Sequence, residues 1–368
     1  MLYQTKGNIL FLVNTPLQLV NAAIIAHTEF NKMSCDIYYT ENICTAALNL
    51  VDKCIFSEGH EIKHVKDMLK RTNVLTRIVV RVKNALDIND IIANLPSNVE
   101  KYDRVFLSGI SLRNCEFYYA IKRLNPRVTL SLYEEGVYEY VGFGKKNYLK
   151  ILFSKFFFGR YYLYDADTLY VHKPDFVINA WNNILLKEIT THYDNMLIKH
   201  ICTAFDYNER IFPEKRVCTI LEQEFYTDEE NAIQRELIDI IENELGNENV
   251  IIKLHPRSMK DKYGNKHTTQ KTSVPFEIIA MNEQIMDNMF ISVTSSAIAN
   301  LYLMLDAQPD IVMLNNLFPV GMSVNKDYDI FLKKIKASYR KNNFVMPKTR
   351  GELTSTINRL RSGYSNED

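Results

Sequence analysis

The chain lacks a long hydrophobic run and an excess of charge of either sign. Lys and Arg total 44, and Asp and Glu also total 44, so the formal net charge is zero. A neutral chain has no general attraction to nucleic acid, and any anion-binding site must be local. The apolar run near the N-terminus, "NILFLV", is too short for a signal-peptide core or a membrane span. We therefore expect a cytoplasmic protein with no nucleic-acid partner.

The six cysteines are scattered along the chain and include no C-x-x-C pair. In a reducing compartment, isolated cysteines are mostly buried thiols. We therefore expect neither a disulfide framework nor a cysteine-based metal site.

What the chain does have is an alternation of apolar runs and amphipathic segments. Its 368 residues suit two domains, and its 46% hydrophobic and 24% charged residues are ordinary for a globular protein. The run at 8–13 is typical of a buried parallel strand, and Thr15 and Pro16 then predict the N-cap and first residue of a helix. A strand that leads directly into a helix begins a doubly wound α/β domain.

The alternation continues through the first half of the chain and restarts after Pro213. Strands are expected at 8–13, 35–40, 53–58, 102–109, 127–132, 168–176, the start of 216–226, 249–257 and 310–314. Helical patterns occupy 61–95, 113–124, 227–246, 274–282 and 350–362; residues 288–305 combine a strand, a hydroxyl-rich turn and a helix, and 177–214 are mostly helical or irregular.

The sequence therefore predicts an α/β chain with two Rossmann-like domains that face a cleft. We assign residues 1–205 to an acceptor-side domain and 206–345 to a donor-binding domain. Residues 346–368 form a terminal helix and tail, for which a return to the first domain is left open by analogy with similar folds.

Two glutamates and a glycine, Glu134, Glu135 and Gly136, follow the expected strand at 127–132. Ligands of such sheets bind beyond the carboxyl ends of the strands. Adjacent carboxylates repel, so one of them holds its proton more tightly, as a general base near neutral pH requires. Since successive strand residues point to opposite faces, one glutamate can face the ligand while the other braces a turn at Gly136. A solvated polar turn is the alternative.

A second candidate site, His255, Pro256 and Arg257, follows the run "VIIKL". Histidine is the side chain best suited to exchange a proton near neutral pH, proline fixes the loop, and arginine offers a bidentate contact to an anion. Lys253 adds a further positive charge. A histidine that is simply hydrogen-bonded at a strand end is the alternative.

A third candidate site, Thr294, Ser295 and Ser296, lies between a strand and a helix. Hydroxyls at this point cap the helix, and the same N-terminus can bind phosphate through its N–H groups and the helix dipole. A plain cap is the alternative.

In this order and on these two halves, "EEG", "HPR" and "SS" resemble the motifs of metal-independent, two-domain bacterial sialyltransferases. The start "TPLQ" resembles that of glycosyltransferase family 52, and the bacterial polysialyltransferases share the acidic-glycine, His-Pro and Ser-Ser motifs. The resemblance lies in motif order across residues 8–305. It implies a GT-B fold and an inverting transfer of sialic acid from CMP-sialic acid to a hydroxyl, with galactose as the expected acceptor sugar, on a lipooligosaccharide, O-antigen or capsule. A polysialyltransferase and a Kdo transferase of the same fold remain alternatives.

The resemblance also implies roles for residues of the donor site. His255 would protonate or hydrogen-bond the departing CMP phosphate. Ser295 and Ser296, with the helix N-terminus that follows, would hold that phosphate. Glu277 would contact the nucleotide ribose; an ordinary first-turn glutamate is the alternative.

The general base has more than one candidate. The resemblance implies that Glu135, or else Glu134, takes the proton from the acceptor hydroxyl. Some family members take the base from the loop after the first strand of the second domain, which makes Glu224 and Asp228 rivals. Asp228 also suits the first turn of a helix. Gln223, in the same loop, is a weaker candidate for the nucleotide site.

No metal or other cofactor is expected. A CMP-sugar has a single phosphate on its leaving group, and a histidine, hydroxyls and a helix dipole can stabilise the charge that develops there. The rival reading is a metal-dependent UDP-sugar transferase, because Asp165-x-Asp167 resembles a metal-binding Asp-x-Asp motif. The pattern recurs as Asp327-x-Asp329, which shows its low specificity.

Residues 145–164 are aromatic and basic, as suits the surface of an anionic membrane and a lipid-linked glycan acceptor. A buried aromatic helix whose lysines extend to solvent explains them equally simply. The sequence leaves open a peripheral position at the inner face of the plasma membrane, a homodimer, and a non-enzymatic nucleotide-sugar or saccharide-binding protein.

Overall fold

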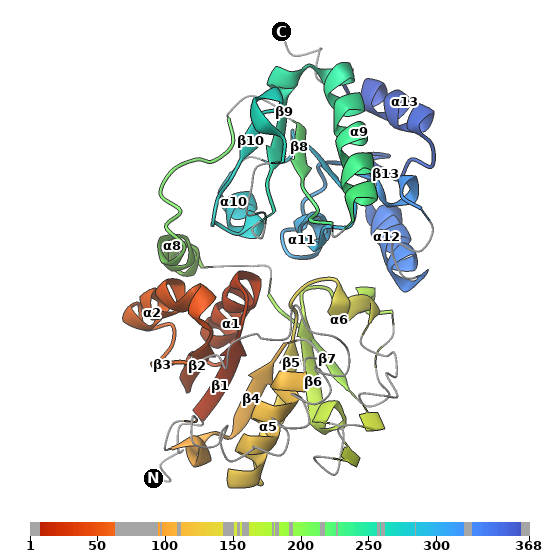
Figure 1. Cartoon of the computed structure of the whole chain (residues 1–368). Helices are drawn as coiled ribbons and strands as arrows, with labels where there is room; N and C mark the ends of the chain where they lie inside the picture. Colours follow the sequence, from red (N-terminus) through yellow and green to blue (C-terminus); the bar gives the residue numbers. More distant parts are fainter. Residues whose placement is uncertain are drawn as a thin grey trace. The chain divides into compact units, whose positions relative to one another are not determined.

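The chain forms two compact units, Met1–Phe205 and Asp206–Asp368, in a computed structural model, and each unit has its own sheet (Figure 1). The structure describes residues 8–62, 95, 98–108, 112–142, 151–152, 155–156, 162–178, 180, 184–190, 194–213, 218–225, 227–255, 258, 262–283, 285–319 and 326–361. Pro256 and Arg257 of the predicted donor site lie outside these residues, as do most of the segments 61–95 and 145–164.

The first unit contains a seven-stranded parallel sheet in the order β3-β2-β1-β4-β5-β6-β7. Its strands are β1 (Asn8–Val13), β2 (Ser34–Tyr39), β3 (Glu58–Glu61), β4 (Arg104–Leu107), β5 (Thr129–Tyr133), β6 (Ala166–Val171) and β7 (Leu185–Glu188). The order 3-2-1-4-5-6 within it is that of a Rossmann sheet. The first unit is therefore Rossmann-like, as the sequence predicted.

The first strand and helix of this unit form as their sequence predicts. After Asn8 every residue of β1 is buried, as in a parallel strand that is covered on both faces. Pro16 is the first residue of α1, and the Thr15 hydroxyl accepts the N–H of Gln18 at 3.4 Å. The helices among the described residues of this unit are α1 (Pro16–Glu29), α2 (Cys44–Asp52), α5 (Leu112–Leu124), α6 (Tyr138–Val141) and α8 (Asn195–Ala204), with 3-10 turns at Glu41–Ile43, Val99–Lys101, Tyr162–Asp165 and Pro174–Phe176.

The second unit contains a six-stranded parallel sheet in the order β10-β9-β8-β11-β12-β13. Its strands are β8 (Cys218–Leu221), β9 (Val250–Lys253), β10 (Thr269–Gln270), β11 (Met289–Ser292), β12 (Asp310–Met313) and β13 (Phe344–Val345). Its helices are α9 (Asp228–Leu245), α10 (Phe276–Asn282), α11 (Ser296–Leu303), α12 (Lys326–Ser338) and α13 (Arg350–Arg361), with 3-10 turns at Asn247–Asn249, Gly264–Lys266 and Asn315–Leu317. Numbered from β8, the strands again have the Rossmann order.

The terminal helix α13 belongs to the second unit and packs beside α9 (Figure 1). Its apolar side chains Leu353, Ile357 and Leu360 are buried in the core of this unit. Arg350 adds an ion pair with Glu236 of α9, Nε–Oε1 2.5 Å. The helix is therefore part of the second unit, and a return to the first domain stays a prediction.

The strand expected at 53–58 is wrong. Residues 53–57 form the turn that ends α2, where Cys54 adopts a φ of 58° and Ile55 donates its N–H to the carbonyl of Leu50. Such left-handed backbone ends a helix and does not occur within a strand. The strand β3 begins only at Glu58.

Three further strands, β7, β10 and β13, were not expected. Each is the edge strand of its sheet and has two to four residues, too few to show a period in the sequence. The helices α2 and α12 were also missed.

Free thiols are present at Cys35, Cys44, Cys54, Cys202 and Cys218; of these, Cys35, Cys202 and Cys218 are buried as expected, whereas Cys54 is exposed. Within the described residues, no helix is long and apolar enough to cross a membrane.

Candidate functional site

Both sheets have a point where the strand order reverses, and ligands of doubly wound sheets bind beyond the carboxyl ends of the strands at that point. In the second sheet β8 lies between β9 and β11. The loops after these three strands carry Gln223, His255 and Thr294, so the predicted donor residues gather at the end of the sheet where the fold binds ligands.

Gln223 and Thr294 are in contact at this point. The hydroxyl of Thr294 donates to the side-chain oxygen of Gln223, with 3.2 Å between Oγ1 and Oε1. The backbone of Gln223 is held from α9, since its N–H donates to Oε1 of Gln234 at 3.0 Å and its carbonyl accepts from Nε2 of Gln234 at 3.1 Å. The structure thus joins two predicted residues that are about 70 positions apart in the sequence.

Ser295 is the N-cap of α11. Its hydroxyl accepts the N–H of Ala297 at 3.3 Å, and its own N–H donates to the hydroxyl of Ser292 at 3.3 Å. Ser296 is the first residue of the helix and is half-buried. The capping role that the sequence allowed is therefore present; phosphate binding at this N-terminus stays a prediction.

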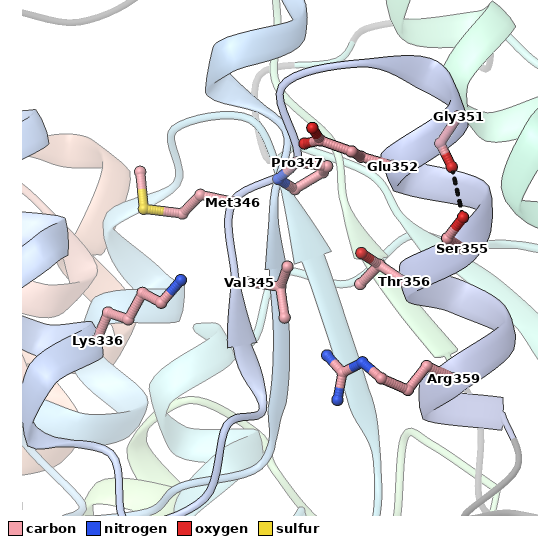
Figure 2. Close-up of a pocket in the computed structure, with 9 residues that line it drawn as sticks. All are labelled: Lys336, Val345, Met346, Pro347, Gly351, Glu352, Ser355, Thr356 and Arg359. Atoms are coloured by element: carbon pink, nitrogen blue, oxygen red, sulfur yellow. Dashed lines mark hydrogen bonds between the residues drawn. The ribbon is translucent and has the colours of Figure 1, made fainter.

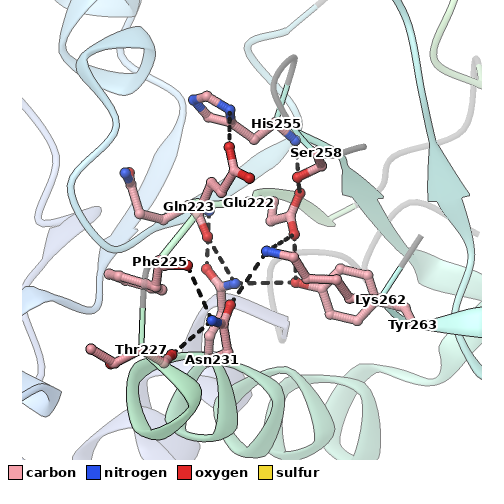
Figure 3. Close-up of polar contacts among 11 residues, drawn as sticks. Glu222, Gln223, Phe225, Thr227, Asn231, His255, Ser258, Lys262 and Tyr263 are labelled. Atoms are coloured by element: carbon pink, nitrogen blue, oxygen red, sulfur yellow. Dashed lines mark hydrogen bonds and ion pairs between the residues drawn. The ribbon is translucent and has the colours of Figure 1, made fainter. Parts of the chain in front are cut away.

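His255 lies half-buried in the loop after β9, beside Glu224 of the loop after β8 (Figure 3). Nδ1 of His255 is 3.7 Å from Oε2 of Glu224, and the two side chains are about one-third exposed. Glu224, predicted as a rival base, thus lies against the predicted acid instead.

Glu222 lies beneath this loop and was not predicted from the sequence. Its side chain is 0% exposed, and its Oε2 accepts the backbone N–H of His255 at 2.8 Å. The one signal in the sequence is an acidic residue directly after a buried strand, which is the signal that identified Glu134.

Lys253 and Glu277 are buried behind the donor loops. Burial lowers the pKa of Lys253, and the charge of Glu277 acts in the opposite direction. Oε1 of Glu277 accepts from Nδ2 of Asn300 at 2.8 Å, a buried contact that joins α10 to α11. Its observed role is structural; contact with a ribose stays a prediction.

Asp228 is the first residue of α9 and is exposed. Thr227 and Glu230 form the capping box expected here, with the Thr227 hydroxyl accepting the N–H of Glu230 at 3.2 Å. Asp228 therefore has the position of a first-turn acid that interacts with the helix dipole.

In the first unit, Glu134 is fully enclosed at the end of β5. Its Oε2 accepts from the hydroxyl of Tyr140 at 2.6 Å and from the backbone N–H of His172 at 2.9 Å, and its carbonyl accepts from Nδ2 of Asn21 at 2.9 Å. Burial and the Glu134 charge raise the pKa of Tyr140, so its hydroxyl stays protonated and donates. Burial lowers the pKa of His172 to about 3, so its imidazole is neutral. Glu134 braces the loop.

Glu135 is half-buried, and its backbone rests on another carboxylate that the sequence did not identify. Oε2 of Glu139 accepts the N–H of Glu135 at 3.1 Å and that of Gly136 at 3.2 Å. Gly136 has a φ of 155°, which a residue with a Cβ atom rarely adopts. Burial, aided by the charge of Glu135, raises the pKa of Glu139 to about 8.

The Asp165-x-Asp167 pattern lies at the amino end of β6, the opposite end of the sheet from Glu134 and Glu135. Asp167 is paired with Arg104, with 3.2 Å between Oδ2 and Nη2. The second such pattern lies in the first turn of α12, where Asp329 pairs with Lys333. Neither pattern lies at the carboxyl end of a strand, where a metal motif of the donor site is expected.

One group of side chains among the described residues has the composition of a metal site. Asp239, Glu242 and His267 place their ligand atoms within 4.8 Å of one another. Within the group, Nδ1 of His267 is 2.6 Å from Oε2 of Glu242, and Nζ of Lys266 is 2.5 Å from Oδ1 of Asp239, so each carboxylate already has a contact with a protein side chain.

The pattern "HEIKH" at 60–64 has the spacing of a helical zinc motif. His60 and Glu61 lie on β3, however, so they point to opposite faces of a strand, and His64 lies outside the described residues. The helix that this chemistry needs is not formed at His60 and Glu61.

A hollow of about 430 Å³ lies at the outer edge of the second sheet, between α12, β13 and α13 (Figure 2). It contains none of the predicted site residues. Its lining is of mixed charge: Lys336, Val345, Met346, Pro347, Gly351, Glu352, Ser355, Thr356 and Arg359. Glu352 already accepts the N–H of Lys348 at 2.7 Å at the start of α13.

No protein-family model matches the chain, and no curated protein sequence does. Solved structures do match it. The glycotransferase of kitacinnamycin superposes with a TM-score of 0.59 at 8% identity, over 97% of this chain and 91% of that one. Arabidopsis thaliana UGT89C1 complexed with UDP-L-rhamnose gives 0.58 at 9% identity, over 99% and 92%. CalG4, the calicheamicin glycosyltransferase, gives 0.52 at 8%, over 99% and 95%.

At such low sequence identity, these structural matches show the fold and nothing finer. Together with the two Rossmann sheets, they show that the chain has the two-domain GT-B fold, as the sequence predicted.

Proposed function

We propose that this protein is an inverting, metal-independent sialyltransferase that moves sialic acid from CMP-sialic acid to a hydroxyl of a bacterial surface glycan, with galactose as the expected acceptor sugar. The observation that supports this proposal most is that Gln223, His255 and Thr294 gather at the carboxyl ends of β8, β9 and β11, respectively. The structures with the same fold include several whose names describe glycosyltransferases.

The reaction forms one bond and breaks another. The acceptor oxygen attacks the anomeric carbon of the sialyl group from the face opposite the phosphate, while Glu135 takes the hydroxyl proton. The bond between that carbon and the phosphate oxygen breaks, and its electron pair stays on the departing CMP. His255 donates a hydrogen bond or proton to this phosphate, and the N-terminus of α11 adds its N–H groups.

The leaving group carries one phosphate, for which His255 and the N-terminus of α11 can offer hydrogen-bond donors. A charge-assisted hydrogen bond contributes about 1.5–3 kcal/mol, so a histidine and a helix N-terminus are sufficient in kind for a single phosphate. Lys253, the last residue of β9, is buried, and burial lowers its pKa.

Calorimetric titration with CMP and with UDP tests the donor class directly. We expect CMP to bind more tightly than UDP, and H255A to weaken CMP binding about 10-fold or more, because the charge-assisted bond is lost. Tighter binding of UDP than of CMP would reject the proposed donor.

A UDP-sugar transferase that does not use Asp165 and Asp167 is the second candidate, because one structure of the same fold is complexed with UDP-L-rhamnose. In that case the loops after β8, β9 and β11 would bind a diphosphate. A polysialyltransferase and a Kdo transferase share the proposed chemistry and differ in acceptor or sugar.

A further inference from the structure

Glu222 is the most enclosed carboxylate of the predicted donor site. It directly follows β8, and its side chain is 0% exposed. Transfer of an unpaired carboxylate into a protein interior costs several kcal/mol, so such a group persists only where donors surround it. Its surroundings therefore indicate what it does.

Donors reach both oxygens of Glu222, and all of them come from the segment that follows β9 (Figure 3). Oε2 accepts the backbone N–H of His255 at 2.8 Å and the hydroxyl of Ser258 at 2.8 Å. Oε1 accepts the hydroxyl of Tyr263 at 3.3 Å and lies 3.6 Å from Nζ of Lys262. The carboxylate thus holds this segment at several points.

The same contacts continue to the other two donor loops. The hydroxyl of Tyr263 accepts from Nε2 of Gln234 at 3.2 Å, and Gln234 holds the backbone of Gln223 at both its N–H and its carbonyl. Gln223 in turn accepts from Thr294. One hydrogen-bonded network therefore connects the loops after β9, β8 and β11.

We propose that Glu222 is a positioning residue, which fixes the backbone of His255 and so aligns the imidazole before the donor binds. The carboxylate takes the N–H of His255, while the imidazole lies beside Glu224. A displacement of about 1 Å in a reacting group can cost about 100-fold in rate. This inference rests on the proposed function for its effect on rate, but the fixation of the loop is independent of the reaction.

The test compares E222Q with E222D and with a matched control, E242Q. Glutamine offers one oxygen where glutamate offers two, so in E222Q an NH2 group must face donors of the loop. Aspartate keeps both oxygens and should restore part of the alignment. Glu242 is a buried glutamate of the same unit that binds His267 and lies outside the network.

Hydrogen–deuterium exchange of the peptide that spans His255, together with steady-state kinetics, gives the readout. In E222Q we expect exchange at this peptide to rise at least 10-fold and kcat to fall about 100-fold, with the donor KM changed less than threefold. E222D should lie between E222Q and the wild type. E242Q should change neither exchange at this peptide nor kcat.

Equal exchange at this peptide in E222Q and E242Q would overturn the inference. Faster exchange in E222Q, found in a protein that turns over no CMP-sugar, would support the positioning role while rejecting the sialyltransferase. If E222Q does not fold, Y263F and S258A can replace it, because each removes one donor to Glu222. Unchanged exchange at the His255 peptide in both variants would also overturn the inference.

Discussion

Glu134 and Glu135 are neighbours in the sequence but have different surroundings. Glu134 is enclosed by Tyr140 and His172, whereas Glu135 is half-buried and rests on Glu139 through its backbone. These contacts show that Glu134 stabilises the loop. Glu135 stays the predicted general base.

E135Q and E134Q should therefore fail in different ways. E135Q removes the base, so we expect kcat to fall about 10²–10⁴-fold with an almost unchanged Tm. E134Q leaves buried donors facing an amide, which costs about 1–3 kcal/mol of stability. Thermal unfolding and kinetics of both variants check this, and loss of kcat in E134Q with full activity in E135Q would reverse the assignment.

Glu139 should make stability depend on pH. Its pKa in the folded protein is about 8 against an ordinary value of 4.5, so the folded state binds the proton more tightly than the unfolded state. Stability from this group is then fully present below pH 4.5 and is lost as the pH rises toward 8. We expect the Tm of the wild type to fall over this window.

E139Q mimics the protonated carboxyl, so its Tm should fall less between pH 5.5 and pH 8.5 than that of the wild type. Calorimetric scans across this range measure the difference. E61Q, at an exposed position on β3, serves as the control and should follow the wild type. An identical fall in E139Q and the wild type would show that Glu139 ionises without penalty.

At the scale of elements, α9 depends on its N-terminal cap. Thr227 and Glu230 satisfy each other's backbone groups, and the helix packs against α13. T227A should lower the free energy of unfolding by about 1 kcal/mol, with the donor affinity unchanged. Denaturant unfolding of T227A and T227S measures this, and an unchanged midpoint in T227A would mean that packing alone sets the start of the helix.

The central strands and their helices were predictable because each carries its own signal. β1 is an uninterrupted apolar run, and α1 and α9 begin at recognisable caps. Edge strands β7, β10 and β13 are fixed by pairing with a neighbour and not by their own composition.

The candidate site was predictable only in part, for a related reason. His255 and Thr294 follow strands, and that position marks them. Glu222 holds the backbone of His255, 33 residues further along the chain, and Glu139 holds that of Glu135, four residues earlier. A sequence shows an acid after a strand but not whether it points to the ligand or to the loop.

At the scale of the whole molecule, the fold repeats one arrangement twice. Both sheets have the Rossmann order, and the predicted residues follow the carboxyl ends of their strands, whereas Asp165 and Asp167 lie at the amino end of β6. The account therefore uses the paired acids of the first unit and the histidine and hydroxyls of the second, and gives the Asp-x-Asp pattern no role in catalysis.

D167N should accordingly weaken a partly exposed ion pair with Arg104 and a hydrogen bond from the hydroxyl of Ser131. Such pairs contribute about 0–1 kcal/mol, so we expect a small change in Tm and no change in kcat or in sensitivity to EDTA. Turnover that is lost in D167N and depends on Mn²⁺ in the wild type would instead favour a metal-dependent enzyme.

Release of CMP from CMP-sialic acid, measured with a galactoside acceptor in EDTA, tests the central claim most directly. The wild type should release CMP at the same rate with and without EDTA, and H255A should be slower by about 10²-fold or more. Release of UDP from a UDP-sugar, with none of CMP from CMP-sialic acid or CMP-Kdo, would contradict the account.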